Sequence, residues 1–382
     1  MANTNTLTYV IPQLLAQGLL ALRQMAIMPR FVNRGYEVLA GEKGSTIDIP
    51  IPSAIAVNQV SPSYVPPDDT GVAPTKVSIA LDQWWEAPFF LSDQDMQNSM
   101  DGTIPMQATE AVKAIANKLD VDLITLYKEV YGNAGTPGTT PFSTDLSEFL
   151  LADQVLNDQL CPPDNRVCVI NARAKANAMA LRAFQDVAWR GDAAGITNGQ
   201  IGEKLGAMWT LDQNLLQHTS GTYPGTGYTV NGVNAANQTA LNISGGAQGT
   251  LTVGDLINIA GWDQWYTIVS TTGAGTITAA VVSPKLVAAT SGSEVITKKG
   301  TNAQKYRVNL LFHRDAFALA SRPFSAADPM GIGFFQSAVD PISGLTLRLE
   351  VTRQHKRTRF SYDILYGVKT VRPELASRII GE

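Results

Sequence analysis

Residues 105–131 constrain the fold more than any other part of the chain, because they are predicted to form one uninterrupted amphipathic helix. Their apolar side chains recur every three or four residues, as on a helix with one buried face; they are Val112, Ile115, Ala116, Leu119, Leu123, Leu126 and Val130. Pro105 suits the first helical turn and Gly132 suits the stop. At about 1.5 Å per residue, the helix should be roughly 40 Å long. Such a strut is more typical of a building block than of a catalyst.

A long extended segment, residues 45–92, precedes this helix. Apolar and polar residues alternate in 46–51 and in 77–81, which predicts two strands, and turn-forming residues fill 61–69 between them. Pro50 and Pro52 cannot donate to a strand ladder, so the first strand needs an open edge. A two-stranded hairpin has too little core to be stable alone. We therefore expect it to lie on something outside itself, and nothing in the chain obviously covers it.

The segments outside 221–300 predict an arm, an α/β region and a terminal sheet. The arm, residues 1–40, contains one helix at about 12–25. After the long helix, the patterns predict helices at 150–160, 172–189 and 313–321, a buried strand at 166–171, and a strand-like piece at 205–211. The chain closes with strands at 345–352 and 360–366, the second continued at 368–371, on either side of a basic turn at 353–359.

Residues 221–300 have a different character. Their charged residues are only Asp255, Asp263, Lys285, Glu294, Lys298 and Lys299. Short alternating runs, separated by glycine-rich turns, occur at 228–230, 256–259, 266–269, 276–278 and 294–296. This pattern predicts a small all-β barrel or sandwich. Because helical material is expected again beyond it, we interpret the β segment as an insertion in the α/β region.

Composition, net charge, the N-terminal sequence and the cysteine spacing argue against several classes of protein. Charged residues make up 16% of the chain, against the roughly 25% usual for soluble domains, so much of the surface can lie in contacts with other chains. The net charge of −4 argues against a protein that wraps nucleic acid by overall attraction. No signal peptide is expected at the N-terminus, and residues 14–28 are too short and too polar to span a bilayer. Cys161 and Cys168 match neither a metal nor a redox spacing, which suits a reducing cytoplasm.

The sequence contains no convincing catalytic or ligand-binding motif. His218, His313 and His355 are far apart and belong to no zinc-binding pattern. Residues 331–333, Gly-Ile-Gly, lack the rest of a dinucleotide-binding loop, and no nucleophile elbow occurs. We therefore predict no catalytic residue, no metal site and no cofactor.

A basic run near the C-terminus consists of Arg353, Lys356, Arg357 and Arg359. These side chains could contact phosphate groups or other charged partners. The run lacks the interleaved aromatic residues of a nucleic-acid platform, and a solvated turn explains it as well. Both interpretations stay open.

The ordered set of segments resembles the major capsid proteins of tailed bacteriophages with the HK97 fold, most closely the P22 coat-protein branch. Residues 44–50 (GSTIDIP) resemble the start of the extended E-loop, and 91–96 (LSDQDM) followed by the long helix resemble the entry to the spine helix. Residues 309–316 (NLLFHRDA) followed by Arg322-Pro323 are similar to the return into the axial domain. Residues 362–369 (YDILYGVK) and 371–374 (VRPE) look like the closing strand and tail. The inserted β segment points to the P22 branch.

This resemblance implies an α+β fold, the HK97-like capsid fold with an inserted all-β, barrel-like domain. It divides the chain into an N-terminal arm (1–40), an E-loop hairpin (41–95), the spine helix of the peripheral domain (96–140), the first part of the axial domain (141–220), the inserted β domain (221–300), the axial return (301–325), and the peripheral strands with the C-terminal tail (326–382).

The resemblance also implies a function. The chain would be a major capsid protein that assembles into pentamers and hexamers of an icosahedral phage head, in the cytoplasm of a bacterial host. Its partners would be other copies of itself, a scaffolding protein, a portal protein and packaged double-stranded DNA held non-specifically; whether a decoration protein binds is left open. The E-loop tip would contact the adjacent subunit; its residues are Tyr64, Val65, Pro66, Pro67, Asp68 and Asp69.

Two alternatives remain at the level of sequence. One is the shell of an encapsulin-like compartment with the same fold, which would bind cargo peptides and no DNA. The other is a cytosolic enzyme with an appended β binding domain, which would need convergent polar groups in a pocket of one subunit.

Overall fold

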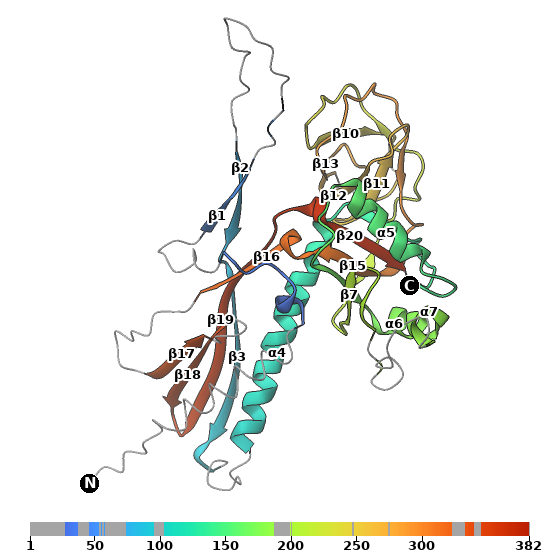
Figure 1. The fold of residues 1–382 in the computed structure, drawn as a ribbon. Coiled ribbons are helices and arrows are strands. Elements are labelled where there is room, and N and C mark those ends of the chain that lie inside the picture. Colours follow the sequence, from blue (N-terminus) through green and yellow to red (C-terminus); the bar gives the residue numbers. More distant parts are fainter. Residues whose placement is uncertain are drawn as a thin grey trace, which may run out of the picture. The chain divides into compact units, whose positions relative to one another are not determined.

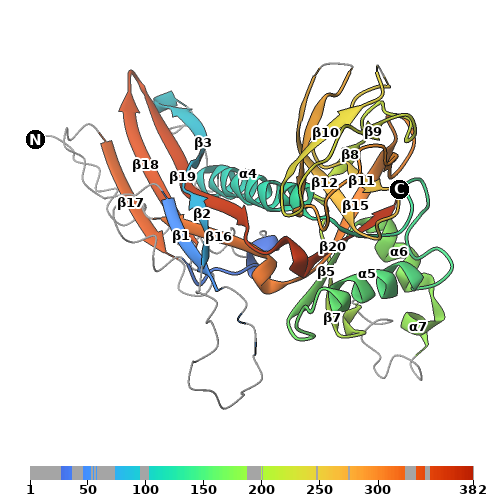
Figure 2. The same ribbon diagram turned by 90° about the horizontal axis from the view of Figure 1, so that it is seen from above.

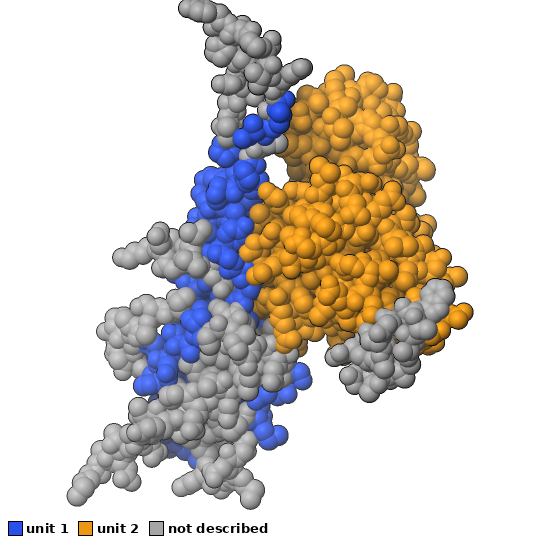
Figure 3. Space-filling view, in the orientation of Figure 1, with its two compact units in different colours: residues 1–23, 34–115, 318–369 blue, residues 24–33, 116–317, 370–382 orange. Residues whose placement is uncertain are grey.

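The computed structural model describes residues 27–36, 46–52, 55, 57, 74–94, 103–186, 199, 201–246, 248–273, 276–322, 333–339 and 345–381 (Figure 1). The chain forms two compact units (Figure 3). Unit 1 contains residues 1–23, 34–115 and 318–369, and unit 2 contains residues 24–33, 116–317 and 370–382. Both units are therefore assembled from segments far apart in the sequence.

Unit 1 is built on a five-stranded sheet with the order β16-β19-β18-β17, in which β3 also pairs with β19. Its strands are β3 (Gln83–Ser92), β16 (Phe317–Arg322), β17 (Gly333–Val339), β18 (Thr346–Gln354) and β19 (Arg357–Thr370). The predicted alternation at the end of the chain is confirmed, because Leu347, Leu349 and Val351 are buried while the residues between them are only half-buried. The N-terminal part of α4 (Thr103–Thr125) runs beside β3 (Figures 1 and 2).

Unit 1 also contains a separate two-stranded antiparallel sheet, formed by β1 (Thr46–Ile51) and β2 (Thr75–Ala80). The two predicted strands are confirmed, and β1 has the open edge that its proline requires, since within the described residues it pairs with β2 alone. The predicted excursion was too long at its far end. Residues 83–92 form β3, which pairs with β19 over ten residue positions instead of extending the hairpin.

Unit 2 contains a seven-stranded mixed sheet with the order β4-β20-β15-β5-β7-β6, in which β8 pairs with β15. Its strands are β4 (Gly132–Ala134), β5 (Arg166–Ile170), β6 (Gly202–Lys204), β7 (Ala207–Leu211), β8 (Gln217–Thr219), β15 (Lys305–His313) and β20 (Ala376–Gly381). The helix α5 (Ser147–Asp158) packs against β4 and β20. The inner strands β5 and β20 are buried on both faces, as expected for largely apolar strands inside a sheet.

The segment between β8 and β15 forms a closed six-stranded barrel. Its strands are β9 (Thr229–Val230), β10 (Ala240–Ser244), β11 (Leu256–Ile259), β12 (Trp265–Thr272), β13 (Ala279–Ser283) and β14 (Ile296–Lys298), in the order β14-β11-β12-β13-β10-β9. A bridge between Thr229 and Val295 joins the two ends of this order, and the Val230 amide donates to the Glu294 carbonyl at 2.9 Å beside it. The barrel interior contains tyrosines and β-branched residues, among them Tyr223, Tyr228, Tyr266, Ile243 and Ile268.

The predicted long helix is shorter than its apolar stripe suggested. α4 ends at Thr125, and a 3-10 helix, η2 (Leu126–Glu129), follows it. Gly132 does not stop a helix but opens β4, which lies parallel to β20. A Cβ atom at Gly132 would lie 2.7 Å from the Ala376 carbonyl oxygen, so the glycine is needed for the close approach of two strands.

Three further predictions of secondary structure were wrong. Residues 313–321, predicted as helix, form a short 3-10 helix, η3 (Arg314–Ala316), followed by β16, in which residues 317–321 are all buried. A short, fully buried apolar run has no period that separates helix from strand. The described part of the predicted helix at 172–189 forms two helices, α6 (Ala172–Ala180) and α7 (Arg182–Gln185), and 187–189 lie outside the described residues. In the barrel, the run at 276–278 is not a strand, and β10 was missed.

Candidate assembly surface

The predicted E-loop tip lies outside the described residues. This holds for all six of its residues, Tyr64, Val65, Pro66, Pro67, Asp68 and Asp69, so only the stalk formed by β1 and β2 can be analysed.

The stalk has one buried and one exposed face. Ile47, Ile49 and Ile79 are buried. On the exposed face the Asp48 carboxylate accepts hydrogen bonds from Lys76 Nζ at 2.7 Å and from Ser78 Oγ at 2.5 Å. These two hydrogen bonds lower the pKa of Asp48. Cross-strand polar pairs of this kind fix the register of the two strands.

The basic run lies at the hairpin between β18 and β19. Arg353 Nη2 lies 2.5 Å from Asp93 Oδ2, and Arg359 Nη2 lies 2.7 Å from Glu86 Oε2. Lys356 occupies the turn itself with a positive φ of 54°. The structure therefore brings the four predicted cations to one end of the sheet, but it neutralises two of them with carboxylates from β3 and the residue after it.

Lys356 and Arg357 remain as charges at this hairpin, since neither has a carboxylate partner among the described residues. Arg357 Nε donates to Gln354 Oε1 at 2.9 Å, and its guanidinium lies 4.7 Å from the centroid of the Phe90 ring. The Phe90 side chain is 47% exposed. The end of the hairpin thus presents an aromatic face together with unpaired positive charge.

A buried arginine that the sequence analysis did not identify fastens the barrel to the central sheet. Arg378 on β20 is completely buried. Its guanidinium donates to the carbonyls of Val130 at 2.6 Å, Gly254 at 2.6 Å and Lys128 at 3.3 Å, and to Thr267 Oγ1 at 2.8 Å. One side chain therefore connects β20, the 3-10 helix η2 with the residue after its end, and the starts of β11 and β12 in the barrel. A single charge in an otherwise apolar strand was the available sequence signal.

His218 forms a second part of this buried junction. Its Nδ1 lies 2.9 Å from the Tyr127 hydroxyl, and its Nε2 lies 2.9 Å from Asp255 Oδ1. Burial alone would raise the pKa of Asp255, but hydrogen bonds from His218 and from the amides of Thr252 and Gly221 outweigh it and lower the pKa. The arrangement resembles a proton relay, but His218 and Asp255 are 3% and 1% exposed. A substrate has no access to it, so its role is structural.

Two consecutive lysines complete the junction on the side of β14. Lys298 Nζ donates to the Gly221 carbonyl at 2.6 Å. Lys299 Nζ donates to Asn133 Oδ1 and lies 5.3 Å from the ring centroid of Trp265. Burial, together with the nearby charge of Arg378, lowers the pKa of Lys299 to about 8. The barrel is therefore held by hydrogen bonds from several buried cations.

The Asp120 carboxylate on α4 binds backbone amides at Ile27 and Met28, the first residues that the structure describes. Its Oδ1 accepts from the amides of Ile27 and Met28, both at 3.1 Å, and its Oδ2 accepts from Ile27 at 3.2 Å. Burial and the neighbouring Asp212 carboxylate raise the pKa of Asp120 to about 7. The carboxylate thus fixes the position at which residues 1–26 join the described fold.

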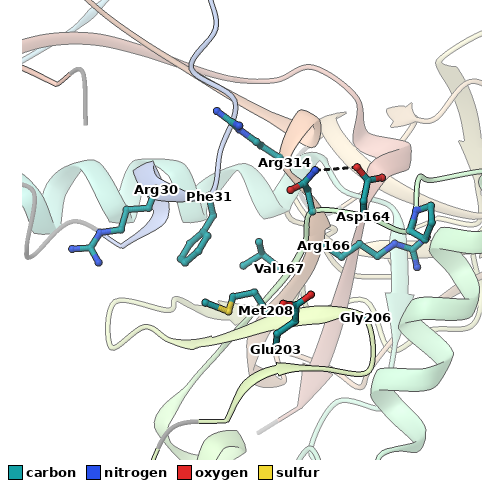
Figure 4. Close-up of a pocket in the computed structure, with 11 residues that line it drawn as sticks. Arg30, Phe31, Asp164, Arg166, Val167, Glu203, Gly206, Met208 and Arg314 are labelled. Carbon is teal, nitrogen blue, oxygen red and sulfur yellow. Dashed lines mark hydrogen bonds between the residues drawn. The ribbon is translucent and has the colours of Figure 1, made fainter. Parts of the chain in front are cut away.

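A hollow of about 650 Å³ lies in unit 2 beside β5 and β7. Figure 4 shows Phe31, Val167 and Met208 around its middle, with Arg30 and Asp164 on opposite sides. This is the kind of pocket that the alternative of an enzyme would need. Its polar side chains do not converge on one point, and within the described residues no group of three or more histidine, cysteine or acidic side chains could hold a metal ion.

In the part of the chain that the structure describes, no helix is long and apolar enough to cross a membrane.

No known family profile matches the chain, and no curated protein is similar to it in sequence. Solved structures do resemble it. A chain from the structure of Mycobacterium phage Che8 is 16% identical, with 94% of this chain and 91% of that chain covered and a TM-score of 0.51. The capsid structure of the Cyanophage P-SCSP1u is 12% identical, with 89% of this chain and 84% of that chain covered and a TM-score of 0.49. The virus-like particle from Pyrococcus furiosus is 8% identical, with 97% of this chain and 98% of that chain covered and a TM-score of 0.43. The likeness to the Che8 chain concerns the fold, and it confirms the predicted α+β, HK97-like fold.

Proposed function

We propose that this chain is the major capsid protein of a tailed bacteriophage, the subunit from which an icosahedral head is built. The observation that carries this proposal is the HK97-like fold, matched along 94% of the chain by a phage structure. The inserted barrel between β8 and β15 favours a relative of the P22 coat-protein branch.

The stalk of β1 and β2 supports the same function. One face of the stalk is covered within the chain, where Ile79 lies beside Gly367 of β19, but the exposed edge of β1 invites pairing with another chain. In a shell, a neighbouring copy would cover the stalk and the tip beyond it. In a monomeric enzyme such a projection would have no evident use.

The buried polar groups also fit a structural protein. Side chains of the types found in catalytic sites occur here in Arg378, His218 and Asp255, but each of them is buried and already hydrogen-bonded. Their arrangement serves to hold the barrel rigidly against the sheet.

The further partners follow from this function. The shell would enclose double-stranded DNA, and with a net charge of −4 it would hold the DNA non-specifically and weakly. A scaffolding protein and a portal protein would take part in assembly in the bacterial cytoplasm, and the finished subunit would reside in the virion.

Electron microscopy of the chain expressed in bacteria tests the proposal. Closed shells or rings of uniform size are expected, alone or with neighbouring phage genes. A stable monomer at high concentration under both conditions would contradict it. Shells that contain peptide cargo and exclude DNA would favour an encapsulin-like compartment. Deletion of residues 61–70 should leave a folded monomer that builds no shells, with a deletion in the exposed barrel turn at 235–237 as the matched control.

A further inference from the structure

The exposed face of α5 is unusually apolar. Its exposed positions, Ser147, Leu150, Leu151, Gln154, Asn157 and Asp158, follow the helical repeat and form one stripe. Leu150 and Leu151 are 55% and 51% exposed. Leu160, just beyond the helix, is 90% exposed. Three large apolar side chains therefore face outward from one short segment, although the opposite face of the helix is well packed.

Leu160 also occupies a position that normally favours glycine. It ends α5 with a positive φ of 58°, and the Cys161 amide donates back to the Leu156 carbonyl at 3.0 Å, as in a glycine-terminated helix. Fold stability does not require a leucine here.

Two exposed carboxylates lie on the same segment as these leucines, while Arg30 and Arg314 line the hollow beside Asp164. Between Lys128 and Arg166 the sequence contains six acidic residues and no lysine, arginine or histidine. Arg166 itself is buried and bound to Asp153 at 2.5 Å. Asp158 and Asp164 are exposed on the same segment as Leu160, and Asp164 lies at the rim of the hollow in Figure 4. We call Leu150, Leu151, Asp158, Leu160 and Asp164 the acidic leucine face.

The hairpin between β18 and β19 has the complementary composition. Its turn presents Lys356 and Arg357, which have no carboxylate partner among the described residues, beside the half-exposed ring of Phe90. Each surface therefore combines exposed apolar groups with charge of one sign, and the two signs are opposite. Complementary charge of this kind fixes the register of two partners.

We propose that the acidic leucine face of one copy binds the basic hairpin of a second copy. Lys356 and Arg357 pair with Asp158 and Asp164, and the Phe90 ring packs against the exposed leucines. This contact rests on the proposed shell function, because it specifies one way in which two subunits meet. It also gives a role to the basic run that the sequence analysis left open between a solvated turn and a charged contact.

Charge exchange between two full-length variants tests the contact. One variant carries Lys356→Glu with Arg357→Glu, and the other carries Asp158→Lys with Asp164→Lys. Each alone is expected to lower the yield of shells at least about tenfold, since like charges then face each other. The quadruple variant is expected to recover assembly, because the charges are opposite again. A mixture of the two double variants is also expected to assemble, because each intact or exchanged surface finds its complement on the other chain.

The outcomes separate this inference from the proposed function. If the unaltered chain builds no shells, the proposed function fails. If the unaltered chain and both double variants assemble equally well, only the contact is refuted. If the quadruple variant recovers but native mass spectrometry of the mixture shows no complex that contains both chains, the pairing lies within one chain, which also refutes the contact. A control variant with Glu110→Lys and Asp263→Lys raises the net charge by as much as the variant with Asp158→Lys and Asp164→Lys, and it should assemble; its failure would attribute the effect to net charge and overturn the proposal.

The apolar part of the contact has its own test. Leu160→Asn keeps a residue that tolerates positive φ, so the variant should fold like the unaltered chain. Weaker assembly at unchanged thermal stability is expected. Unchanged assembly would show that Leu160 takes no part in the contact.

Discussion

Replacing Arg378 with methionine should weaken the attachment of the barrel to the central sheet. Methionine fills a similar volume without hydrogen bonds or charge. The substitution leaves the carbonyls of Val130, Gly254 and Lys128 and the hydroxyl of Thr267 without the donor that they now share. Because these acceptors lie in the interior, water cannot easily replace the guanidinium.

Two opposing effects set the change in the free energy of unfolding that Arg378→Met should cause. Each orphaned buried acceptor costs roughly 1–3 kcal/mol. The Lys128 carbonyl keeps its hydrogen bond from Thr267 Oγ1 at 2.7 Å, so the two orphaned carbonyls, those of Val130 and Gly254, together cost roughly 2–6 kcal/mol. The variant no longer has to bury a guanidinium, which returns several kcal/mol. We expect a net loss of about 2 kcal/mol in the free energy of unfolding.

Urea unfolding of the full chain measures this loss, and hydrogen exchange locates it. Exchange should accelerate most in β11 and β12 and at 128–130, which meet at the guanidinium. Arg182→Met is the matched control, because the Arg182 side chain is 76% exposed and its pair with Asp186 at 3.4 Å lies on the surface; it should cost no more than about 1 kcal/mol. A loss for Arg378→Met as small as that of the control would refute the reasoning.

Three further substitutions have defined outcomes. The pKa of Asp120 is raised from 3.8 to about 7, so the folded state holds the proton more tightly than the unfolded state. The free energy of unfolding should therefore fall as pH rises from about 4 to 7. In Asp120→Asn this part of the pH dependence should vanish, which urea titrations at pH 5 and 8 would measure. Leu160→Gly should raise the free energy of unfolding by about 1 kcal/mol, because glycine has no penalty at positive φ; a loss of stability in thermal unfolding would contradict this. Gly367→Ala should destabilise unit 1, because its Cβ atom would lie 2.2 Å from the Ala80 carbonyl oxygen; a melting temperature equal to that of the unaltered chain would refute the close approach.

Local periodicity was sufficient to predict several elements of this fold. The stripe from Val112 to Leu123 gave the long helix, and alternation gave β1, β2 and β18. Where one face of an element is buried and the other is not, the sequence contains the period of the element. At 317–321, inside the segment that was predicted as helix, this information is absent because both faces are buried.

The closure of the barrel and its attachment could not be predicted in this way. The bridge from Thr229 to Val295 joins residues whose relation no short window contains. Arg378 and Lys128 are 250 positions apart. Contacts of this kind depend on the completed sheet, so the sequence indicated only that a charge lay in an apolar strand.

The position of Arg378 explains how a large insertion can coexist with an intact sheet. The barrel leaves the central sheet after β8 and returns to it at β15, and β8 and β15 are paired with each other. The insertion therefore starts and ends at adjacent points and does not interrupt the ladder. Two adjacent connections alone would leave the barrel free to pivot. The guanidinium from β20, a strand that pairs with β15 on its other side, supplies a third, distant point of attachment, and three such points define an orientation.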